Sequence, residues 1–432
     1  MNSEKKRIAF HTLGCKLNFS ETAQLSKDIN KFGYKKVDYH EESDVYVLNT
    51  CSVTQNADKE ARKLIRKAKR KNADSIIAII GCYAQLKPDE ISSIDGVNLI
   101  LGTKEKFNLL EHLGQLKTNS DVKIIRSDIS DEHSFKPSFT TGERTRSFLK
   151  IQDGCDYSCS FCTIPFARGK SRSDTIENTI KSAQEISSTT NTREIVLTGV
   201  NIGDFNKENP KAFLELIQQL DNLNEIDRIR ISSIEPNLLT DEIIEFCSAS
   251  NKLMPHFHIP LQSGSDKILK TMRRRYKKNL YFEKVSKIKS LNPDTCIGTD
   301  VIVGFPGETD KDFLETYNFL NDLDVSYLHV FPYSERSNTL AAELGDSVSN
   351  ELRAERSKML HFLSNKKQRH FISQHIGTNR YVLFENTKSN KLNGYTDNYI
   401  KVQIDSHLEL TNTIQKIKLF ENKGKFVEGK LL

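Results

Sequence analysis

Three closely spaced cysteines, Cys155, Cys159 and Cys162, are the residues in this chain whose spacing most clearly suggests chemistry. They are separated by three and then two residues, so their thiols can curl around one metal centre. A four-iron cluster normally takes four cysteine ligands. A loop that supplies three leaves one iron with an open position where a small molecule can bind.

A structural zinc site is the alternative for the same loop. Such a site takes four ligands that close the coordination sphere, usually as two pairs. No second Cys-x-x-Cys pair follows at the zinc-finger distance, and His133, His256 and His258 could be recruited only by folding. We therefore favour an iron-sulfur cluster over zinc.

The spacing Cys-x-x-x-Cys-x-x-Cys, followed by repeated strand and helix patterns, resembles the radical S-adenosylmethionine (SAM) enzymes. In that superfamily the open iron of a 4Fe-4S cluster binds SAM, and reduction cleaves the sulfonium to give a 5′-deoxyadenosyl radical. The resemblance implies that Cys155, Cys159 and Cys162 hold such a cluster and that SAM is a cofactor. The cofactor then carries the chemistry and the protein places it.

Three further cysteines, Cys15, Cys51 and Cys82, each follow an apolar run in the N-terminal third, and a helix is expected from Ser20 to about Phe32. The runs are 8–10, 44–51 and 75–82. Apolar runs that alternate with helices predict a parallel sheet covered on both faces. Ligands bind beyond the carboxyl ends of such strands. We therefore expect the three thiols to converge on a shared cluster; the alternative is that each is a small buried apolar side chain.

The segments around these cysteines, residues 12–18, 49–54 and 81–85, resemble the cysteine motifs of the methylthiotransferase N-terminal domain. In that family the three cysteines hold a second, auxiliary 4Fe-4S cluster, also with an open iron. The resemblance implies this role for Cys15, Cys51 and Cys82.

A basic helix is predicted at residues 58–71. Ala61, Leu64, Ile65 and Ala68 fall on one face, which would dock the helix on the sheet. The other face is almost wholly cationic. A solvated face and a phosphate-binding surface both remain open, because unrelieved like charges cost some helix stability.

Strand candidates recur after the cysteine loop, with helical patterns between them, at residues 194–198, 228–232, 257–260, 298–303 and 327–331. The spacing predicts a partial (β/α) barrel, in which functional groups lie on the loops after the strands. The resemblance implies SAM contacts in these loops: Gly199 and Asn201 near the amino acid portion, and Ser232, Glu235 and Gln262 near the ribose. Each loop taken alone could be a simple turn.

Three arginines and two further cysteines of this region also need an interpretation. The segment 273–275, with three arginines, could reach the SAM carboxylate or RNA, or could be a solvated basic turn. Cys247 and Cys296 are interpreted as packing cysteines.

A long basic helix is predicted at residues 351–373. Its expected inward side chains are Leu352, Met359, Leu360, Phe362 and Leu363, and its expected outward ones are Arg353, Arg356, Lys358, Lys366, Lys367 and Arg369. Strands at 381–384, 399–404 and 414–419, with a turn at Asn393-Gly394, predict a small β-barrel. Residues 394–399 resemble the RNA-binding TRAM domain; a merely stabilising barrel is the alternative.

The bulk properties fit an α/β chain of several domains in a reducing compartment. Its 432 residues suggest two to three domains, which we place at 5–120, 141–372 and 374–432, with 112–146 as a connection. Net charge is +6, and the eight cysteines do not form a disulfide framework. Because no apolar stretch suits a signal peptide or a membrane span, we expect a cytoplasmic protein without a membrane partner.

The whole chain thus resembles the radical SAM methylthiotransferase family, and residues 13–18 resemble the type that acts on tRNA. That type adds a methylthio group to C2 of N6-threonylcarbamoyladenosine at position 37, using SAM as methyl donor and radical source. Implied partners are the tRNA anticodon stem-loop, an electron donor such as flavodoxin or ferredoxin, and a sulfur source. The alternatives are sister enzymes acting on isopentenyl-adenosine or a ribosomal protein, and a non-catalytic RNA-binding protein with structural metal.

Overall fold

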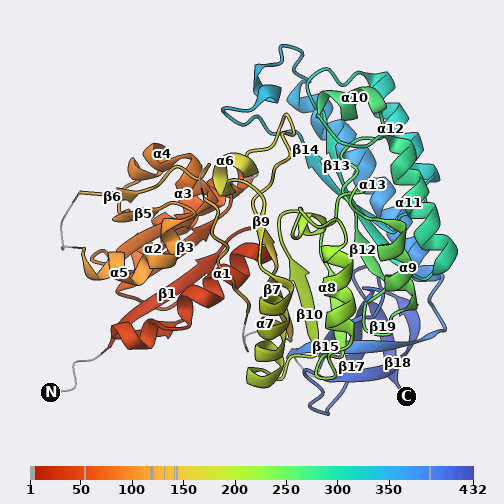
Figure 1. The fold of residues 1–432 in the computed structure, drawn as a ribbon, viewed down its shortest axis with the longest axis horizontal. Coiled ribbons are helices and arrows are strands. Elements are labelled where there is room, and N and C mark those ends of the chain that lie inside the picture. The colour runs from red at the N-terminus through yellow and green to blue at the C-terminus, as the bar shows by residue number, and fades with distance from the viewer. Residues whose placement is uncertain are drawn as a thin grey trace. The chain divides into compact units, whose positions relative to one another are not determined.

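The computed structural model describes residues 5–52, 55–116, 121–130, 132–140, 142, 145–388 and 391–432 (Figure 1). Val53 and Thr54, the end of the second cysteine motif, lie outside the described residues. The chain forms two compact units. The first consists of Met1–Thr140, Gln152–Ser158 and Cys162–Ser173, and the second of Thr141–Ile151, Cys159–Phe161 and Asp174–Leu432.

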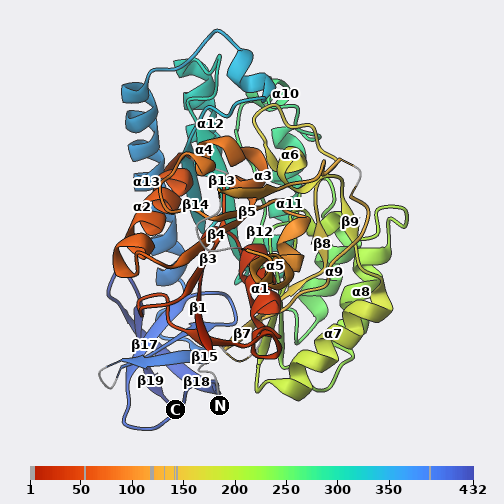
Figure 2. The same ribbon diagram turned by 90° about the vertical axis from the view of Figure 1, so that its left-hand side faces the viewer.

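A six-stranded sheet is the centre of the first unit, in the order β2-β1-β3-β4-β5-β6 (Figure 2). Each neighbouring pair is parallel. The strands are β1 (Lys6–Thr12), β2 (Tyr34–Val37), β3 (Val45–Thr50), β4 (Ile76–Gly81), β5 (Leu99–Leu101) and β6 (Lys123–Ile125). The parallel sheet is confirmed. The expected connection at 112–146 is wrong in part, since it contains β6 at the edge of this sheet.

Helices cover both faces of the sheet because strand side chains alternate between the two sides. Tyr46 and Leu48 of β3 pack with the helices α2 (Gln55–Lys71), α3 (Cys82–Leu86) and α4 (Pro88–Ser92). Val45 and Val47 pack on the opposite side with α1 (Lys16–Ser26), η1 (Ile29–Phe32) and α5 (Leu109–Gly114). The cover on both faces is therefore confirmed.

The first helix differs from its prediction. Instead of one helix from Ser20 to Phe32, α1 begins at Lys16 and ends at Ser26, and the separate turn η1 follows. Cys15 is the N-cap of α1 and has extended backbone angles. The helix starts earlier because no breaker stands between Lys16 and Ser20, so a cysteine directly precedes its first turn.

The first unit also contains the segment that carries two of the loop cysteines. A short antiparallel pair, β8 (Gln152–Asp153) and β9 (Arg172–Ser173), brackets the helix α6 (Ile164–Arg168).

Parallel strands in two groups of three form the larger part of the second unit (Figure 1). They are β7 (Arg146–Lys150), β10 (Glu194–Thr198), β11 (Arg228–Ile231), β12 (His256–His258), β13 (Cys296–Val303) and β14 (Tyr327–Pro332). A bridge between Ser233 and His258 connects the group β11-β10-β7 to the group β12-β13-β14. The helices between them are α7 (Ile176–Thr189), α8 (Ala212–Asp221), α9 (Asp241–Ala249), α10 (Asp266–Thr271), α11 (Lys278–Leu291) and α12 (Asp310–Asp322). This arrangement confirms the partial (β/α) barrel.

The long helix α13 (Asn350–Ser373) buries Leu360 and Leu363 as predicted, but four other side chains differ from the prediction. Arg353 and Arg356 are buried, whereas Phe362 is 74% exposed and Met359 is also exposed. Arg356 pairs with Glu308 at 2.6 Å and with Asp310 at 2.7 Å. Because these carboxylates satisfy its charge, the guanidinium can lie inside where an apolar side chain was expected.

A closed five-stranded barrel ends the chain, and Figure 2 draws it in blue. Its strands are β15 (Asn379–Lys388), β16 (Lys391–Thr396), β17 (Lys401–Asp405), β18 (Ile414–Asn422) and β19 (Val427–Leu431). The predicted barrel is confirmed, but the turn at Asn393-Gly394 is wrong. Both residues lie inside β16, where a Cβ on Gly394 would come 2.3 Å from the carbonyl oxygen of Leu383. Close backbone approach, rather than a turn, requires this glycine.

Among the described residues, none of the helices combines the length and the apolarity that crossing a bilayer requires.

Candidate iron-sulfur and SAM sites

Cys15, Cys51 and Cys82 lie at the carboxyl edge of the six-stranded sheet, as expected. Cys51 directly follows β3, Cys82 begins α3 directly after β4, and Cys15 lies three residues after β1. A Cβ added to Gly14 would come within 2.5 Å of Cys51 Cβ and 3.1 Å of its Sγ. Gly14 has φ +100, so the turn before Cys15 has both the conformation and the closeness that glycine permits. The structure therefore brings the backbone beside Cys15 against Cys51.

The charged groups that act on the Cys82 thiol show that it lies near Cys15. Burial raises the pKa of the Cys82 thiol, while the charges of Arg168 and Lys106 act to lower it; Cys15 is close enough to contribute as well. Metal ligation requires the thiolate, which nearby cations favour. Burial thus disfavours the thiolate of Cys82, whereas the two nearby cations favour the thiolate that a cluster would bind.

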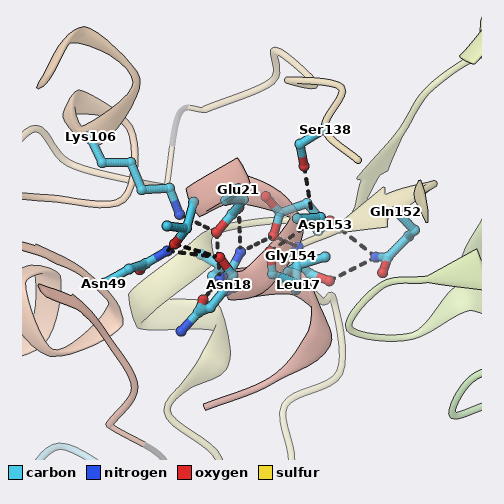
Figure 3. Close-up of polar contacts among 12 residues, drawn as sticks. Leu17, Asn18, Glu21, Asn49, Lys106, Ser138, Gln152, Asp153 and Gly154 are labelled. Carbon is cyan, nitrogen blue, oxygen red and sulfur yellow. Dashed lines mark hydrogen bonds and ion pairs between the residues drawn. The ribbon is translucent and has the colours of Figure 1, made fainter. Parts of the chain in front are cut away.

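A buried ionic network, which was not predicted from the sequence, lies next to these thiols. Figure 3 shows Glu21, Lys106 and Asp153 of this network. Glu21 and Lys106 are both fully buried and form an ion pair at 2.5 Å. The Arg168 guanidinium, 1% exposed, contacts Glu21 at 3.1 Å and Asp153 at 2.9 Å. Cys82 and both carboxylates raise the pKa of Arg168, against the opposing effect of its burial. These four side chains come from segments as far apart as α1 and α6, so no local pattern could pair them.

The Cys155 loop is held by backbone contacts within the first unit. The Cys155 N–H donates to the carbonyl of Gly169 at 3.0 Å, and the Tyr157 N–H donates to Cys155 Sγ at 3.4 Å. Gly154 has φ +69, and a Cβ there would come 2.0 Å from the carbonyl oxygen of Lys170. A donor aimed at the sulfur favours the thiolate that a cluster needs. Cys162, partly buried, stands two residues before α6.

Cys159 belongs to the second unit, where Arg274 contacts its sulfur. Arg274 Nη1 lies 3.1 Å from Cys159 Sγ, and the same guanidinium forms an ion pair with Glu235. The Arg274 side chain is 4% exposed, which excludes the solvated basic turn for this residue, whereas Arg273 and Arg275 are exposed. Burial raises the pKa of Glu235, and Arg274 opposes that shift. Arg274 is therefore a cation in direct contact with the thiol of a candidate cluster ligand.

The residues expected to contact SAM follow three neighbouring strands of the partial barrel. Gly199 and Asn201 come after β10, Ser232 and Glu235 after β11, and Gln262 after β12. Asn201 is buried, and Gln262 has φ +68 and pairs with Val301. The Ser232 hydroxyl is buried, and no described residue forms a hydrogen bond with it. Glu235 forms an ion pair with Arg274.

Cys247 and Cys296 behave as the packing cysteines that the sequence indicated. Both are buried, and burial raises the pKa of each thiol. Cys296 forms part of an apolar cluster with Phe371 and Ile372.

In the part of the chain that the structure describes, no three His, Cys, Asp or Glu side chains are close enough to bind one metal ion. The thiols that hold a 4Fe-4S cluster each bind a different iron, so they stand farther apart than the ligands of a single ion. The donors on Cys155 and Cys159 and the glycine before Cys15 fit thiolate clusters.

The fold and the cysteine loop define a radical SAM enzyme. Residues 149–320 match the Radical SAM superfamily, and residues 7–102 match Uncharacterized protein family UPF0004. The solved structure of the radical SAM methyltransferase TsrM from Kitasatospora setae, with tryptophan substrate and SAM analogue bound, superposes with a TM-score of 0.55. It covers 75% of this chain and 72% of that chain at 12% identity, so this likeness shows the fold alone.

Curated relatives define the family more narrowly. The chain is 40% identical to threonylcarbamoyladenosine tRNA methylthiotransferase MtaB of Bacillus subtilis, over 97% of this chain and 96% of that protein. It is 35% identical to the MtaB of Aquifex aeolicus, over 95% and 99%. It is 32% identical to tRNA-2-methylthio-N(6)-dimethylallyladenosine synthase of Endomicrobium trichonymphae, over 95% and 96%. The chain belongs to the MtaB family of radical SAM methylthiotransferases, and SAM and a 4Fe-4S cluster are its cofactors.

Proposed function

We propose that this enzyme adds a methylthio group to C2 of N6-threonylcarbamoyladenosine at position 37 of tRNA. The observation that carries the proposal is the gathering of Cys15, Cys51 and Cys82 at one edge of the sheet, in the unit that also carries Cys155 and Cys162. A radical SAM enzyme that only abstracts hydrogen has no need of this second cysteine group. Five relatives at 32–40% identity bear the MtaB name.

Each cysteine group would hold one 4Fe-4S cluster. Cys155, Cys159 and Cys162 would hold the cluster that binds SAM, and Cys15, Cys51 and Cys82 the auxiliary one. When bound, these groups supply a radical able to attack an unactivated aromatic C–H and a sulfur to replace the hydrogen. Burial raises the pKa of the Cys159 thiol and Arg274, in contact with its sulfur, acts to lower it, while the Tyr157 N–H donates to the sulfur of Cys155.

The remaining candidate residues orient SAM. Gly199 and Asn201 would contact its amino acid portion, and Ser232, Glu235 and Gln262 its ribose. The buried hydroxyl of Ser232 supports this assignment, because a buried polar group without a partner is costly unless a ligand satisfies it. Glu235 acts in addition through Arg274.

Two further partners follow from the chemistry. Reductive cleavage of SAM needs an electron from outside, which a flavodoxin or ferredoxin would supply. Sulfur leaves with each product, so a sulfur source must restore it. These partners and the tRNA are cytoplasmic, and we place this enzyme in the cytoplasm as well.

The RNA would be held by charge and by stacking. The target base must leave the anticodon-loop stack to react, which a single-stranded loop permits at low cost. The C-terminal barrel, as a TRAM domain, would contact the RNA. Helix α2 supplies a second surface: Ala61, Leu64, Ile65 and Ala68 dock it on the sheet, as predicted, and Lys59, Lys63, Arg66, Lys67 and Arg70 face solvent.

Neutralising the α2 surface should weaken tRNA binding. Within the described residues, neither Lys63 nor Arg66 forms an ion pair, so both are available to phosphates. In the double variant Lys63→Gln/Arg66→Gln, the slope of log K against log salt concentration should fall by about 1 to 2 in magnitude. A salt titration of tRNA binding by fluorescence anisotropy measures this slope.

A matched control removes the same charge elsewhere. Lys284 and Lys287 of α11 pair with Asp241 and Glu245 at 2.7 Å each. The variant Lys284→Gln/Lys287→Gln should keep the wild-type salt slope. Equal slopes for the two double variants would exclude α2 as a phosphate-binding surface and leave it as a solvated face.

The second candidate substrate is dimethylallyl- or isopentenyl-adenosine at the same position, because relatives at 32–34% identity are named for it. One measurement separates the two. A strain that lacks this enzyme should lose the methylthio derivative of threonylcarbamoyladenosine from its tRNA, as seen by mass spectrometry of nucleosides, and retain that of isopentenyl-adenosine. The reverse pattern would establish the second candidate, and loss of neither would contradict a tRNA substrate.

A further inference from the structure

One buried guanidinium contacts two segments that each carry candidate cluster ligands. Arg168, at the end of α6, donates through Nη2 to Asn18 Oδ1 at 2.6 Å and through Nη1 to Asp153 Oδ1 at 2.9 Å. Asn18 belongs to α1, whose N-cap is Cys15. Asp153 stands two residues before Cys155. Figure 3 shows Asn18 and Glu21 lying beside Asp153 and Gly154.

From Asn18 the contacts continue to the backbone beside two cysteines. Asn18 Nδ2 donates to the carbonyl of Leu13 at 2.8 Å and to that of Thr50 at 3.3 Å. Leu13 precedes Cys15 by two residues, and Thr50 directly precedes Cys51. Asn49 Nδ2 in turn donates to the Asn18 carbonyl at 3.0 Å. Asn18 is thus a clamp between the turn before Cys15 and the end of β3.

On its other side the guanidinium reaches the Cys155 loop. Asp153 Oδ1 accepts from Gly154 N–H at 2.8 Å, and Arg172 contacts Asp153 Oδ2 at 3.1 Å. The residue after Arg168, Gly169, accepts the hydrogen bond from Cys155 N–H. Arg168 is therefore connected by one or two hydrogen bonds to the backbone next to Cys15, Cys51 and Cys155.

Opposite charges face one another in this network. The buried carboxylates of Glu21 and Asp153 contact the buried cations Lys106 and Arg168, and Asp153 also contacts Arg172. A well-packed apolar cluster is often as stable as a buried ion pair, whereas the directed bonds of a planar guanidinium fix one arrangement. A role in geometry accounts for such a network better than a role in stability.

We propose that Arg168 is a positioning residue that fixes the backbone of the Cys15 and Cys51 turns and of the Cys155 loop in one arrangement. The role of these cysteines as cluster ligands depends on the proposed function. The hydrogen bonds that connect Arg168 to both segments do not depend on it. Arg168→Gln should loosen both segments. Arg168→Lys should loosen them as well, because an ammonium keeps the charge but cannot bridge Asn18 and Asp153 in fixed directions.

Hydrogen exchange of the full-length, cluster-free chain, followed by mass spectrometry, tests this link without reference to activity. Peptides that cover residues 9–18 and 152–158 should exchange about tenfold faster or more in both Arg168 variants. Asn18→Ala should accelerate the first peptide only, because it breaks the clamp and leaves Arg168 on Asp153. This variant also decides the matter if the Arg168 variants fail to fold.

The matched control breaks a buried ion pair within the second unit. Arg230 contacts Glu194 at 2.9 Å in the second unit, with both side chains almost fully buried. Arg230→Gln should leave both peptides at the wild-type rate. The proposal is overturned if Arg230→Gln accelerates them as much as Arg168→Gln does, or if neither Arg168→Gln nor Asn18→Ala changes them. A wild-type chain that binds only one cluster would instead contradict the proposed function and leave this result standing.

Discussion

Cys15→Ala is expected to form 5′-deoxyadenosine from SAM but no methylthio-nucleoside. Cys15 is exposed at the N-cap of α1, so its replacement leaves no cavity and should not change the free energy of unfolding measurably. The Cys155 loop, with its contacts from Gly169 and Tyr157, is unaltered. Losing one of three ligands should release the auxiliary cluster and with it the sulfur to be transferred. SAM cleavage should therefore become uncoupled from product formation.

The measurement combines iron content with two products. After anaerobic reconstitution, bound iron should fall from about eight to about four atoms per chain. Chromatography with mass spectrometry then quantifies 5′-deoxyadenosine and the methylthio-nucleoside in a tRNA reaction. Cys247→Ala is the control, because it removes a buried packing thiol from α9 and should keep both clusters and both products. Full methylthio transfer by Cys15→Ala would show that Cys15 is not an auxiliary ligand.

Cys159→Ala should abolish both 5′-deoxyadenosine and methylthio transfer. Its sulfur is the group that Arg274 Nη1 contacts at 3.1 Å, inside a buried pair with Glu235. Removing the thiol takes one acceptor from a buried cation, at a cost of about 1–3 kcal/mol. It also removes one ligand of the cluster that binds SAM, so no radical can form while the auxiliary cysteines remain intact.

Comparing Cys159→Ala with Cys15→Ala separates the roles of the two cysteine groups. Both should lose about half of the iron, but only Cys159→Ala should lose SAM cleavage. A thermal unfolding scan shows whether the Cys159→Ala chain stays folded. Should folded Cys159→Ala still generate 5′-deoxyadenosine, the assignment of the loop Cys155–Cys162 to SAM would have to be given up.

Several strands could be predicted from the sequence because buried parallel strands are continuous apolar runs. Residues 44–51 and 75–82 became β3 and β4, and the run at 194–198 became β10. The convergence of Cys15, Cys51 and Cys82 followed from the same rule, since carboxyl ends of parallel strands meet at one edge. Both the fold class and this part of the site were thus predictable.

Charged side chains with distant partners were not predictable. Arg353 and Arg356 were expected on the outside of α13, yet Glu308, Asp310 and the carbonyl of Tyr333 satisfy them inside. Phe362, which was expected to face inward, is exposed instead. Periodicity shows which face of a helix is apolar, but not where a carboxylate elsewhere in the chain makes a buried arginine acceptable.

The ionic network next to the thiols was missed for the same reason. Glu21, Lys106, Asp153 and Arg168 stand in four separate segments, and none belongs to a local motif of charge. Arg274 was named beforehand only as part of the segment 273–275, which was expected to reach the SAM carboxylate or RNA or to be a solvated basic turn. Its contact with Cys159 became visible when the fold placed it there.

The path of the chain through its two compact units limits how the protein can be divided. A fragment that stops at residue 140 would retain Glu21 and Lys106 in its interior but lack Arg168 and Asp153, which return to that unit from later in the chain. Glu21 would lose its ion pair with Arg168, and α3 would lose the helix α6 that packs against it. Such a fragment contains all six strands of the N-terminal sheet, but the interior beside Glu21 and α3 is completed only by residues 152–173.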